Sequence, residues 1–535
     1  MVQITPNNLG FSPQEERKLV WKIDLRLIPI LGLLYLISFI DRVNIGQAKL
    51  DGIIEDLNLQ DHEFQNTNTV FFATYVAFET FSNLIIKRYS PRRTLPTMIT
   101  VWGIILVAQS FVKNYGGLIT TRVLLGVAES GLFPAHNATG AIYIISLYYP
   151  RQEQALRMGF LFSACVLAGA FGGILAYGLS QMRGIGGLPG RWAWIFCIEG
   201  LASFVVGVFS YWAVVDLPSD ATFLTDRQRA FVIHRIKYGQ GALSLDVDFT
   251  WDHVFSALRD FKMYIFAALY FMACTLLYSL ATFSPTIIKE LGSWSTAQSQ
   301  LLTVPPYAAG FLVTVGAAYI SDRTGKRGII IMISGLVAMV GYIIIQVVPD
   351  SAPGAKYFAI FLCVMGFSPA AAVILAWGAG SFGPTYKRGV TQGFIMLSDK
   401  KSNVLLRNSA GILSSYLYPD SGIPYFRIGH SVCAAMGFSL FVVSFVMYFI
   451  LKHENKKRDE KYGTLEEIYT IIQENPLAEI VNEKGSDELT TNFSAIRNEF
   501  VDLPDILLER WGFQDHSRQD IANLGDKHPM FRYLC

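Results

Sequence analysis

One stretch of the sequence limits the possible folds more than any other: the run from Leu27 to Leu50, LIPILGLLYLISFIDRVNIGQAKL. Its first fourteen residues carry no charge, and Asp41 and Arg42 then follow side by side. A helix that spans a membrane needs about 20 apolar residues, so counting from Leu27 places this pair before the far end. Each such charge costs roughly 2.5–3.5 kcal/mol, and charged residues at this depth usually mark a pathway or a partner inside the bundle. We therefore expect both side chains inside a helical bundle; the alternative is that they mark the helix end at the headgroups.

The composition indicates that lipid covers much of the surface. Of 535 residues, 52% are hydrophobic and only 16% are charged, whereas a soluble protein usually carries about 25% charged residues. The formal net charge of +2 argues against nucleic acid as a partner. Five of the six cysteines lie in apolar runs, and their spacing matches neither a metal site nor a disulfide framework. We expect no metal and no cofactor.

Twelve apolar runs divide the chain into two groups of six, separated by a polar stretch. Such an arrangement is typical of transporters built from two related halves. We predict an all-α polytopic membrane protein with twelve transmembrane helices in two pseudo-symmetric six-helix halves. The runs lie near 27–50, 70–86, 95–112, 118–149, 159–179, 192–215, 262–284, 300–320, 329–348, 357–382, 390–417 and 431–451.

The loops give the expected topology. Lysine and arginine concentrate in loops on one side, such as KRYSPRR and SDRTGKR, whereas DGIIEDLNLQDHE on the other side is acidic. The positive-inside rule then places both termini in the cytoplasm, and we expect a monomer in the plasma membrane. The predicted parts are a cytoplasmic segment 1–24, bundles 25–217 and 260–451, a central cytoplasmic loop 218–259 and a cytoplasmic tail 452–535.

The loop SDRTGKRG, residues 321–328, carries a recognisable motif. It resembles the D-R-x-G-[KR]-R loop of the major facilitator superfamily, in which an acid at a helix end can pair with arginines across a short turn. The glycine that the family places four residues before the aspartate is Ala318 here, and the equivalent first-half loop, NLIIKRYSPRR, does not match. The resemblance implies the twelve-helix fold and a gating role for Asp322, Arg323, Lys326 and Arg327.

Four longer stretches resemble the fungal allantoate and nicotinate permease branch of the anion:cation symporters. They are FIDRVNIGQAKL, TRVLLGVAESGLFP, SACVLAGAFGGILAYG followed by GRWAWIFCIEG, and SPTIIKELG with QLLTVPPYAAGF. The likeness covers about residues 18–450, and the ending LGDKHPMFRY shares it. It implies a secondary active transporter that takes up a small organic anion, such as allantoate, nicotinate or a vitamin-like monocarboxylate, with protons by alternating access.

The resemblance also implies functional residues on the first and fourth helices, in the patterns D-R-x-N and R-x-x-x-G-x-x-E. The acids Asp41 and Glu129 would carry the coupled protons. The arginines Arg42 and Arg122 would attract the anion, with Asn44 beside them as a further substrate contact. A protonated acid would release a neighbouring arginine to the substrate carboxylate, and deprotonation would recapture it.

Depth counting agrees with part of this assignment. At 1.5 Å per residue, Asp41 lies ~21 Å from the inner end of a helix that starts at Leu27. Arg122 lies ~24 Å from the inner side of a ~30 Å core, so the two can be neighbours. Glu129 is two turns beyond Arg122 on the same face, and we expect it to be that arginine's partner when no substrate is bound. The alternative is an ion pair that only holds helices together.

Three other polar positions in the spans are weaker candidates. Tyr75 and Glu79 share a face of the second helix at spacing i, i+4. We expect Tyr75 to contact substrate, and Glu79 to be either a gating contact or an acid of the substrate site. Asn408 is expected to face the cavity from the eleventh helix, with ordinary helix packing as the alternative.

The eleventh span is interrupted by nine residues, Asp399 to Arg407, with the sequence DKKSNVLLR. Their four charges would add roughly ten kcal/mol to the insertion of a continuous helix. We predict that the segment is extruded as a loop or bulge, or is an artefact of the gene model.

Other functions remain as alternatives. A nutrient sensor with a transporter fold would be favoured by a long signalling domain, whereas the tail here has only about 80 residues. An exporter of a small carboxylate would use the same residues. A membrane-embedded enzyme is not expected, because the spans contain no metal-ligand cluster or nucleophile constellation. The expected partners are a small organic anion, protons and the lipid bilayer.

Overall fold

The structure is a computed structural model of the whole chain. It describes residues 11–468 apart from 61, 90, 131–140, 180–181, 183–187, 189, 216–217, 240–250, 293, 383–386, 388–389, 392–405 and 465–466, together with 510–511 and 533. Within these residues the secondary structure is helical, without a strand. The predicted extrusion of Asp399 to Arg407 falls on residues outside this part, up to the start of a helix at Leu406.

The N-terminal half opens with a long helix. The first helix is capped at Ser12, whose hydroxyl accepts from the Glu15 amide while the Glu15 carboxylate accepts from the Ser12 amide, a reciprocal arrangement that satisfies two amides at a helix start. The helices of this half are α1 (Pro13–Leu50), α2 (Ile53–Asp56), α3 (Glu63–Tyr89), α4 (Pro91–Gln109), α5 (Tyr115–Glu129), α6 (Ala141–Tyr148), α7 (Arg151–Leu179) and α8 (Arg191–Ala213).

The C-terminal half follows a polar connection that contains two short helices, α9 (Asp226–Gly239) and α10 (Trp251–Leu258). Where a helix of this half begins, local sequence again explains the start: the Asp260 carboxylate accepts from the Lys262 amide. The helices are α11 (Phe261–Leu291), α12 (Thr296–Leu301), α13 (Val304–Thr324), α14 (Arg327–Val347), α15 (Pro353–Gly380), α17 (Leu406–Leu417) and α18 (Arg427–Tyr462).

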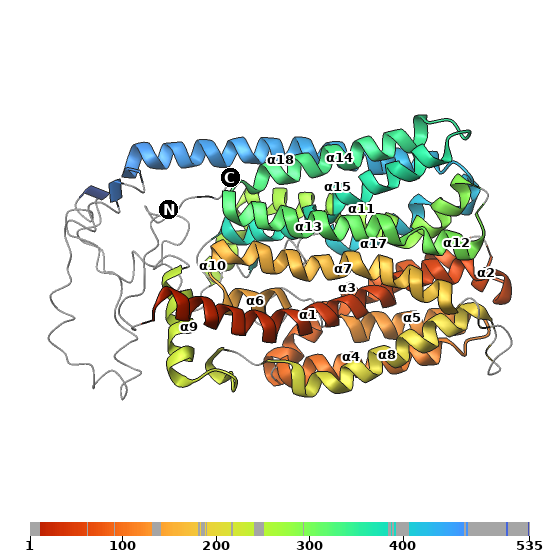
Figure 1. Ribbon diagram of the computed structural model, residues 1–535, viewed down its shortest axis with the longest axis horizontal. Helices are drawn as coiled ribbons and strands as arrows, with labels where there is room; N and C mark the ends of the chain where they lie inside the picture. The colour runs from red at the N-terminus through yellow and green to blue at the C-terminus, as the bar shows by residue number, and fades with distance from the viewer. Residues whose placement is uncertain are drawn as a thin grey trace.

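Eight stretches of the described chain are long and apolar enough to cross a membrane. They begin at Pro13, Leu156, Arg191, Phe261, Thr296, Arg327, Pro353 and Arg427. Figure 1 shows the N-terminal helices in the lower part of the view, red to yellow, and the C-terminal helices in the upper part, green to blue. The predicted all-α polytopic fold is therefore confirmed.

Each half holds one helix pair together through facing glycines. Between α4 and α8, a Cβ on Gly103 would lie 2.9 Å from the carbonyl oxygen of Gly200. Between α14 and α18, a Cβ on Gly335 would lie 2.7 Å from the carbonyl oxygen of Gly437. Small residues allow backbones in a membrane to approach this closely, so the two halves use the same packing device at matching helix pairs.

The halves meet through α7 on α13, α1 on α11 and α3 on α17. The start of α1 and the end of α18 lie at one end of the bundle, which we call the termini end; α2 and α12 lie at the opposite end (Figure 1). Hydrogen bonds join the halves at the opposite end: the Gln300 amide donates to Asp51 at 3.1 Å, and Asn68 donates to Ser415 at 2.7 Å. These contacts hold the two halves together on that side.

Candidate functional site

Polar side chains gather on α1 in the interior of the N-terminal half. Asp41, Arg42 and Asn44 have relative exposures of 0%, 4% and 1%. They are therefore inside the bundle. Helices α3, α4, α5 and α8 supply their partners. We call the group of Asp41, Arg42, Asn44, Arg122, Glu129 and Glu199 the charged cluster.

Asp41 is held by neutral donors. The indole Nε1 of Trp102 on α4 donates to its Oδ2 at 3.0 Å, and the hydroxyl of Ser203 on α8 donates to the same oxygen at 2.7 Å. Among the described residues Asp41 makes no ion pair. Its position on α1 next to Arg42 was predicted, but these two partners were not.

Arg42 pairs with Glu129. The Arg42 Nε lies 2.9 Å from Glu129 Oε2, and both side chains are buried. The Ser38 hydroxyl donates to the same carboxylate oxygen at 3.4 Å. The Arg42 guanidinium also lies 4.7 Å from the centroid of the Tyr75 ring, a cation–π contact. The expected contact of Tyr75 with substrate stays a prediction.

The expected pairing of Arg122 with Glu129 is wrong. The two residues share a face of α5, but among the described residues Arg122 Nε and Nη1 have no acceptor and Glu129 Oε1 has no donor, so no ion pair joins them. Arg42 reaches Glu129 from α1 instead. The acid and the arginine that pair are therefore on different helices, α5 and α1.

Arg122 is instead only loosely held. Its Nη2 donates to the Asn44 side-chain carbonyl at 3.4 Å, and its guanidinium lies 5.5 Å from the Phe196 ring centroid. The side chain is 0% exposed, and within the described part of the chain its Nε and Nη1 have no hydrogen-bond acceptor. A buried guanidinium with unused donors is costly, and donors of this kind suit a carboxylate ligand.

Glu199 completes the charged cluster, and the sequence analysis did not assign it. The Asn44 side-chain nitrogen donates to Glu199 Oε2 at 3.0 Å, and Glu199 is 4% exposed on α8. A signal was present in the sequence: Glu199 is the only charged residue between Trp192 and Val215. An isolated acid in an apolar span is a candidate functional residue.

Two predicted site residues cannot be placed by their contacts. Glu79 lies on α3 and Asn408 on α17, but the side chains of both fall outside the described part. Their roles stay predictions.

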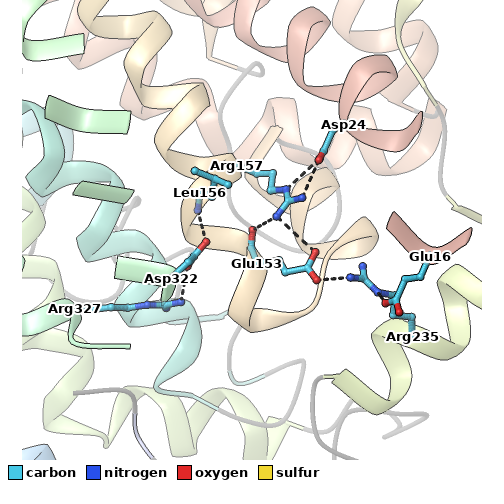
Figure 2. A network of polar contacts seen from close by, with 8 residues as sticks. All are labelled: Glu16, Asp24, Glu153, Leu156, Arg157, Arg235, Asp322 and Arg327. Atoms are coloured by element: carbon cyan, nitrogen blue, oxygen red, sulfur yellow. Dashed lines mark hydrogen bonds and ion pairs between the residues drawn. The ribbon is translucent and has the colours of Figure 1, made fainter. Parts of the chain in front are cut away.

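A second polar region lies at the termini end and joins the two halves (Figure 2). Asp322 on α13 accepts from the backbone amide of Leu156 on α7 at 2.6 Å and pairs with Arg327 at 3.6 Å. Arg327 also donates to the carbonyl of Ala376 on α15. Asp322 and Arg327 therefore connect α13, α14 and α15 to α7.

The remaining members of the predicted gating group differ from these two. Arg323 and Lys326 are exposed, and Arg323 contacts the Tyr319 hydroxyl at 3.5 Å within its own helix. The four residues of the loop motif thus divide into two groups. Asp322 contacts the N-terminal half and pairs with Arg327, whereas Arg323 and Lys326 lie at the surface.

The same region contains ion pairs that the sequence analysis missed. Arg157 donates to both carboxylate oxygens of Asp24 on α1, at 3.1 and 2.8 Å. Arg235 on α9 pairs with Glu16 at 2.7 Å and also contacts Glu153 on α7. Figure 2 shows that α9 is thereby attached to both α1 and α7. No short motif marks these residues, because they come from three separate helices, α1, α7 and α9.

Comparisons with known proteins agree with this architecture. The model of the Major Facilitator Superfamily matches residues 31–399. An uncharacterized transporter of Schizosaccharomyces pombe is 34% identical over 464 residues, which is 86% of this chain and 89% of the relative. The high-affinity nicotinic acid transporter of Saccharomyces cerevisiae is 31% identical over 444 residues, 83% of this chain and 79% of the relative.

One solved structure shows the same fold. A bacterial homolog of the human lysosomal transporter Spinster, in an inward-facing and occupied conformation, matches with a TM-score of 0.56. The match covers 82% of this chain and 97% of that one at 13% identity. At this identity the likeness concerns the fold alone.

Proposed function

The chain belongs to the Major Facilitator Superfamily and is a membrane transporter, and from this premise we propose that it takes up a small organic anion together with protons. Access to the site would alternate by rocking of the two halves. The observation that carries the proposal is Arg122, a buried guanidinium whose Nε and Nη1 have no acceptor among the described residues.

Arg122 is suited to a carboxylate in its chemistry and surroundings. The planar fork of an arginine can hold a carboxylate by two parallel hydrogen bonds, which a lysine ammonium cannot do. Its one hydrogen bond, from Nη2 to the neutral Asn44 side chain at 3.4 Å, leaves Nε and Nη1 for an anion. The name of one relative, a nicotinic acid transporter, supports a monocarboxylate as the substrate class.

Proton coupling is supported by the charge balance of the site. Three buried carboxyl groups, Asp41, Glu129 and Glu199, face two guanidinium groups, Arg42 and Arg122. With every group ionised the charged cluster would carry one uncompensated negative charge in a medium of low dielectric constant, which is costly. Binding a proton removes that charge, whereas binding an anion adds one, so the two events favour each other.

The geometry supports Glu129 and Asp41 as the proton carriers. When Glu129 accepts a proton, its ion pair with Arg42 weakens, and Arg42 can then contribute to the anion site beside Arg122. When Glu129 loses the proton, it recaptures Arg42. Asp41 is held by two neutral donors, so it can be protonated without leaving a buried cation unpaired.

Gating is proposed at the contact of Asp322 and Arg327 with α7. Opening toward the termini end requires α13 to separate from α7, and the Asp322 bond to the Leu156 amide must then break. Opening toward the opposite end requires loss of the Asp51–Gln300 and Asn68–Ser415 bonds. We further propose cytoplasmic termini, the plasma membrane and a monomer.

The test is uptake of labelled small carboxylates in a transport-deficient host, with a panel that includes allantoate, nicotinate, ureidosuccinate, pantothenate and biotin. Arg122→Ala should abolish uptake of the accepted anion, and Arg122→Lys should lose most of it although the charge remains. Surface expression is measured for each variant. A well-expressed Arg122→Ala protein with near wild-type affinity would show that the anion binds elsewhere.

A further inference from the structure

A buried chain of three side chains connects Glu199 on α8 to Arg122 on α5. Asn44 on α1 lies between them: its side-chain nitrogen donates to Glu199 Oε2 at 3.0 Å, and its side-chain oxygen accepts from Arg122 Nη2 at 3.4 Å. All three residues are at most 4% exposed. Their contacts are therefore not shared with bulk water.

The chemistry of the two outer groups fixes the orientation of the amide between them. An ionised carboxylate can only accept hydrogen bonds, and a guanidinium can only donate them. If the Asn44 amide were turned by half a rotation, its nitrogen would face the arginine and its oxygen the carboxylate. Both contacts would then be repulsive. Glu199 and Arg122 therefore both favour the orientation in which the Asn44 oxygen faces Arg122.

In this arrangement Asn44 takes the place of a direct ion pair between Glu199 and Arg122. Arg42, in direct contact with Glu129 at 2.9 Å, is held by a full ion pair. Arg122 is held through a neutral amide, by one long bond, while its Nε and Nη1 have no acceptor among the described side chains and backbone. This single bond orients the guanidinium, and most of its donors are left for a ligand.

We propose that Glu199 is a positioning residue that acts through Asn44 to hold the Arg122 guanidinium in the geometry that receives the anion. This inference rests on the proposed function, since it assigns Glu199 to the same site. It predicts that the affinity for the anion depends more on a hydrogen-bond acceptor at residue 199 than on a negative charge there, because the acceptor orients the Asn44 amide.

The variants follow from that distinction. Glu199→Leu removes the acceptor, whereas Glu199→Gln retains a carbonyl oxygen that can accept from Asn44. Asn44→Leu breaks the same connection from the other side, so the connection can still be tested if Glu199→Leu folds poorly. The matched control is Ser210→Ala, also buried on α8, where the hydroxyl donates to the carbonyl of Val206 in its own helix.

The first readout is the kinetics of anion uptake at constant surface expression. Glu199→Leu and Asn44→Leu should each raise KM by about tenfold or more with Vmax unchanged, because a hydrogen bond that involves a charged group is lost. Glu199→Gln should recover most of the affinity, and Ser210→Ala should match the wild type. The assignment would be overturned if KM were unchanged in Glu199→Leu. It would also be overturned if KM rose as much in Glu199→Gln as in Glu199→Leu.

The second readout does not depend on the substrate. Thermal unfolding of purified protein is compared for Asn44→Leu, Glu199→Leu and the double variant, because residues joined by a hydrogen bond give non-additive effects. Additive shifts in Tm would refute the connection between Glu199 and Asn44 whatever the protein transports. If the cycle is non-additive but Arg122→Ala still transports the anion normally, the connection stands and the proposed function fails.

Discussion

The interiors of the two halves bury different kinds of polar groups. In the N-terminal half, α1, α5 and α8 place three acids and two arginines in one group. In the C-terminal half the corresponding first helix, α11, buries hydroxyl groups instead. All acids that are less than 9% exposed in the described chain belong to the N-terminal half: Asp41, Asp51, Glu129 and Glu199.

In the C-terminal half, four buried cations each pair with a separate acid. Lys262 pairs with Glu454, Arg327 with Asp322, Lys356 with Asp350 and Lys387 with Asp260, and each pair lies near a helix end. The charged cluster of the N-terminal half has more acids than bases and leaves Arg122 without a carboxylate partner among the described residues. A proton can neutralise the excess acid and an anion can pair with Arg122, so the proposed coupling chemistry lies in the N-terminal half.

The C-terminal half still contributes a surface to this site. Tyr278 of α11 stacks on Phe39 of α1, with ring centroids 6.1 Å apart, and its ring centroid lies 5.1 Å from that of Phe72 on α3. These aromatic residues lie beside the charged cluster at the junction of the halves. The comparison therefore predicts large effects from acids in the N-terminal half and smaller effects from neutral polar groups in the other.

The strongest test of this comparison is to neutralise the acids of the charged cluster. Asp41→Asn and Glu129→Gln should each abolish proton-driven accumulation, and at least one should retain binding or exchange of the anion, because only the proton site is lost. The control is Thr275→Val on α11, whose buried hydroxyl donates to the carbonyl of Phe271 in its own helix. Accumulation is measured against external pH. Wild-type accumulation in both acid variants, or an equal loss in the control, would contradict the comparison.

The next effect concerns the contact between the halves at the termini end. Asp322→Ala removes the acceptor of the Leu156 amide and leaves Arg327 buried without its acid, which costs about 3 kcal/mol or more. The native Cys165 is 1% exposed on α7, the helix that packs on α13. Its labelling by a maleimide, followed by mass spectrometry, should become faster. Arg323→Ala, an exposed change in the same loop, should leave the rate unaltered; equal rates in both variants would show that Asp322 does not hold the halves together.

A third prediction concerns Tyr533, which bonds to Lys262 and Asn455 of the C-terminal half. Tyr533 is 4% exposed; its amide and carbonyl both bond to the Asn455 side chain, and its hydroxyl accepts from Lys262 at 2.6 Å. Tyr533→Ala should lower the free energy of unfolding by about 2 kcal/mol, the value of a hydrogen bond to a charged group. Anion affinity should not change, because the site lies in the other half.

Thermal unfolding in detergent measures this effect. The control is Arg510→Ala, whose exposed ion pair with Glu467 at 4.0 Å should contribute little. A change in anion affinity in Tyr533→Ala would show that the two halves are not as independent as the comparison assumes.

The smallest effect is expected at Asp51, at the end opposite the termini. Burial raises the pKa of Asp51 from its ordinary value of 3.8, and the hydrogen bond from Gln300 opposes this only in part. A carboxyl group whose pKa is raised in the folded state favours folding while it is protonated. The stability therefore falls as pH rises from the ordinary pKa to the raised pKa, and it stays level above that range. Asp51→Asn should remove this loss and raise the stability at neutral pH.

The Tm of both proteins, measured from pH 4 to 8, checks this sign. The wild-type Tm could instead rise over this pH range by more than the Tm of Asp51→Asn. That result would mean that the surroundings stabilise the Asp51 carboxylate, and that its ionisation does not weaken the contact between the halves.

Much of the fold could be predicted from the sequence, and less of the site. The apolar runs gave the helical membrane architecture, and the position of Asp41 and Arg42 within the first run predicted their burial. Asp322 and Arg327 were found through a local motif. Glu129 was identified as a site residue but was given the wrong arginine, and Glu199 was overlooked although it stands alone in an apolar span.

Sequence alone determined which segments enter the membrane, because lipid requires a long apolar helix and few other patterns satisfy it. Only the tertiary structure decided which charges meet. Whether Glu129 faces Arg42 or Arg122 depends on the rotation and depth of α5 relative to α1, and these are set by packing between helices far apart in the chain. The same holds for Arg235, which reaches Glu16 and Glu153 from α9. Hydrophobic periodicity fixes one face of each helix, but the partner on that face is determined by the neighbours against which the helix packs.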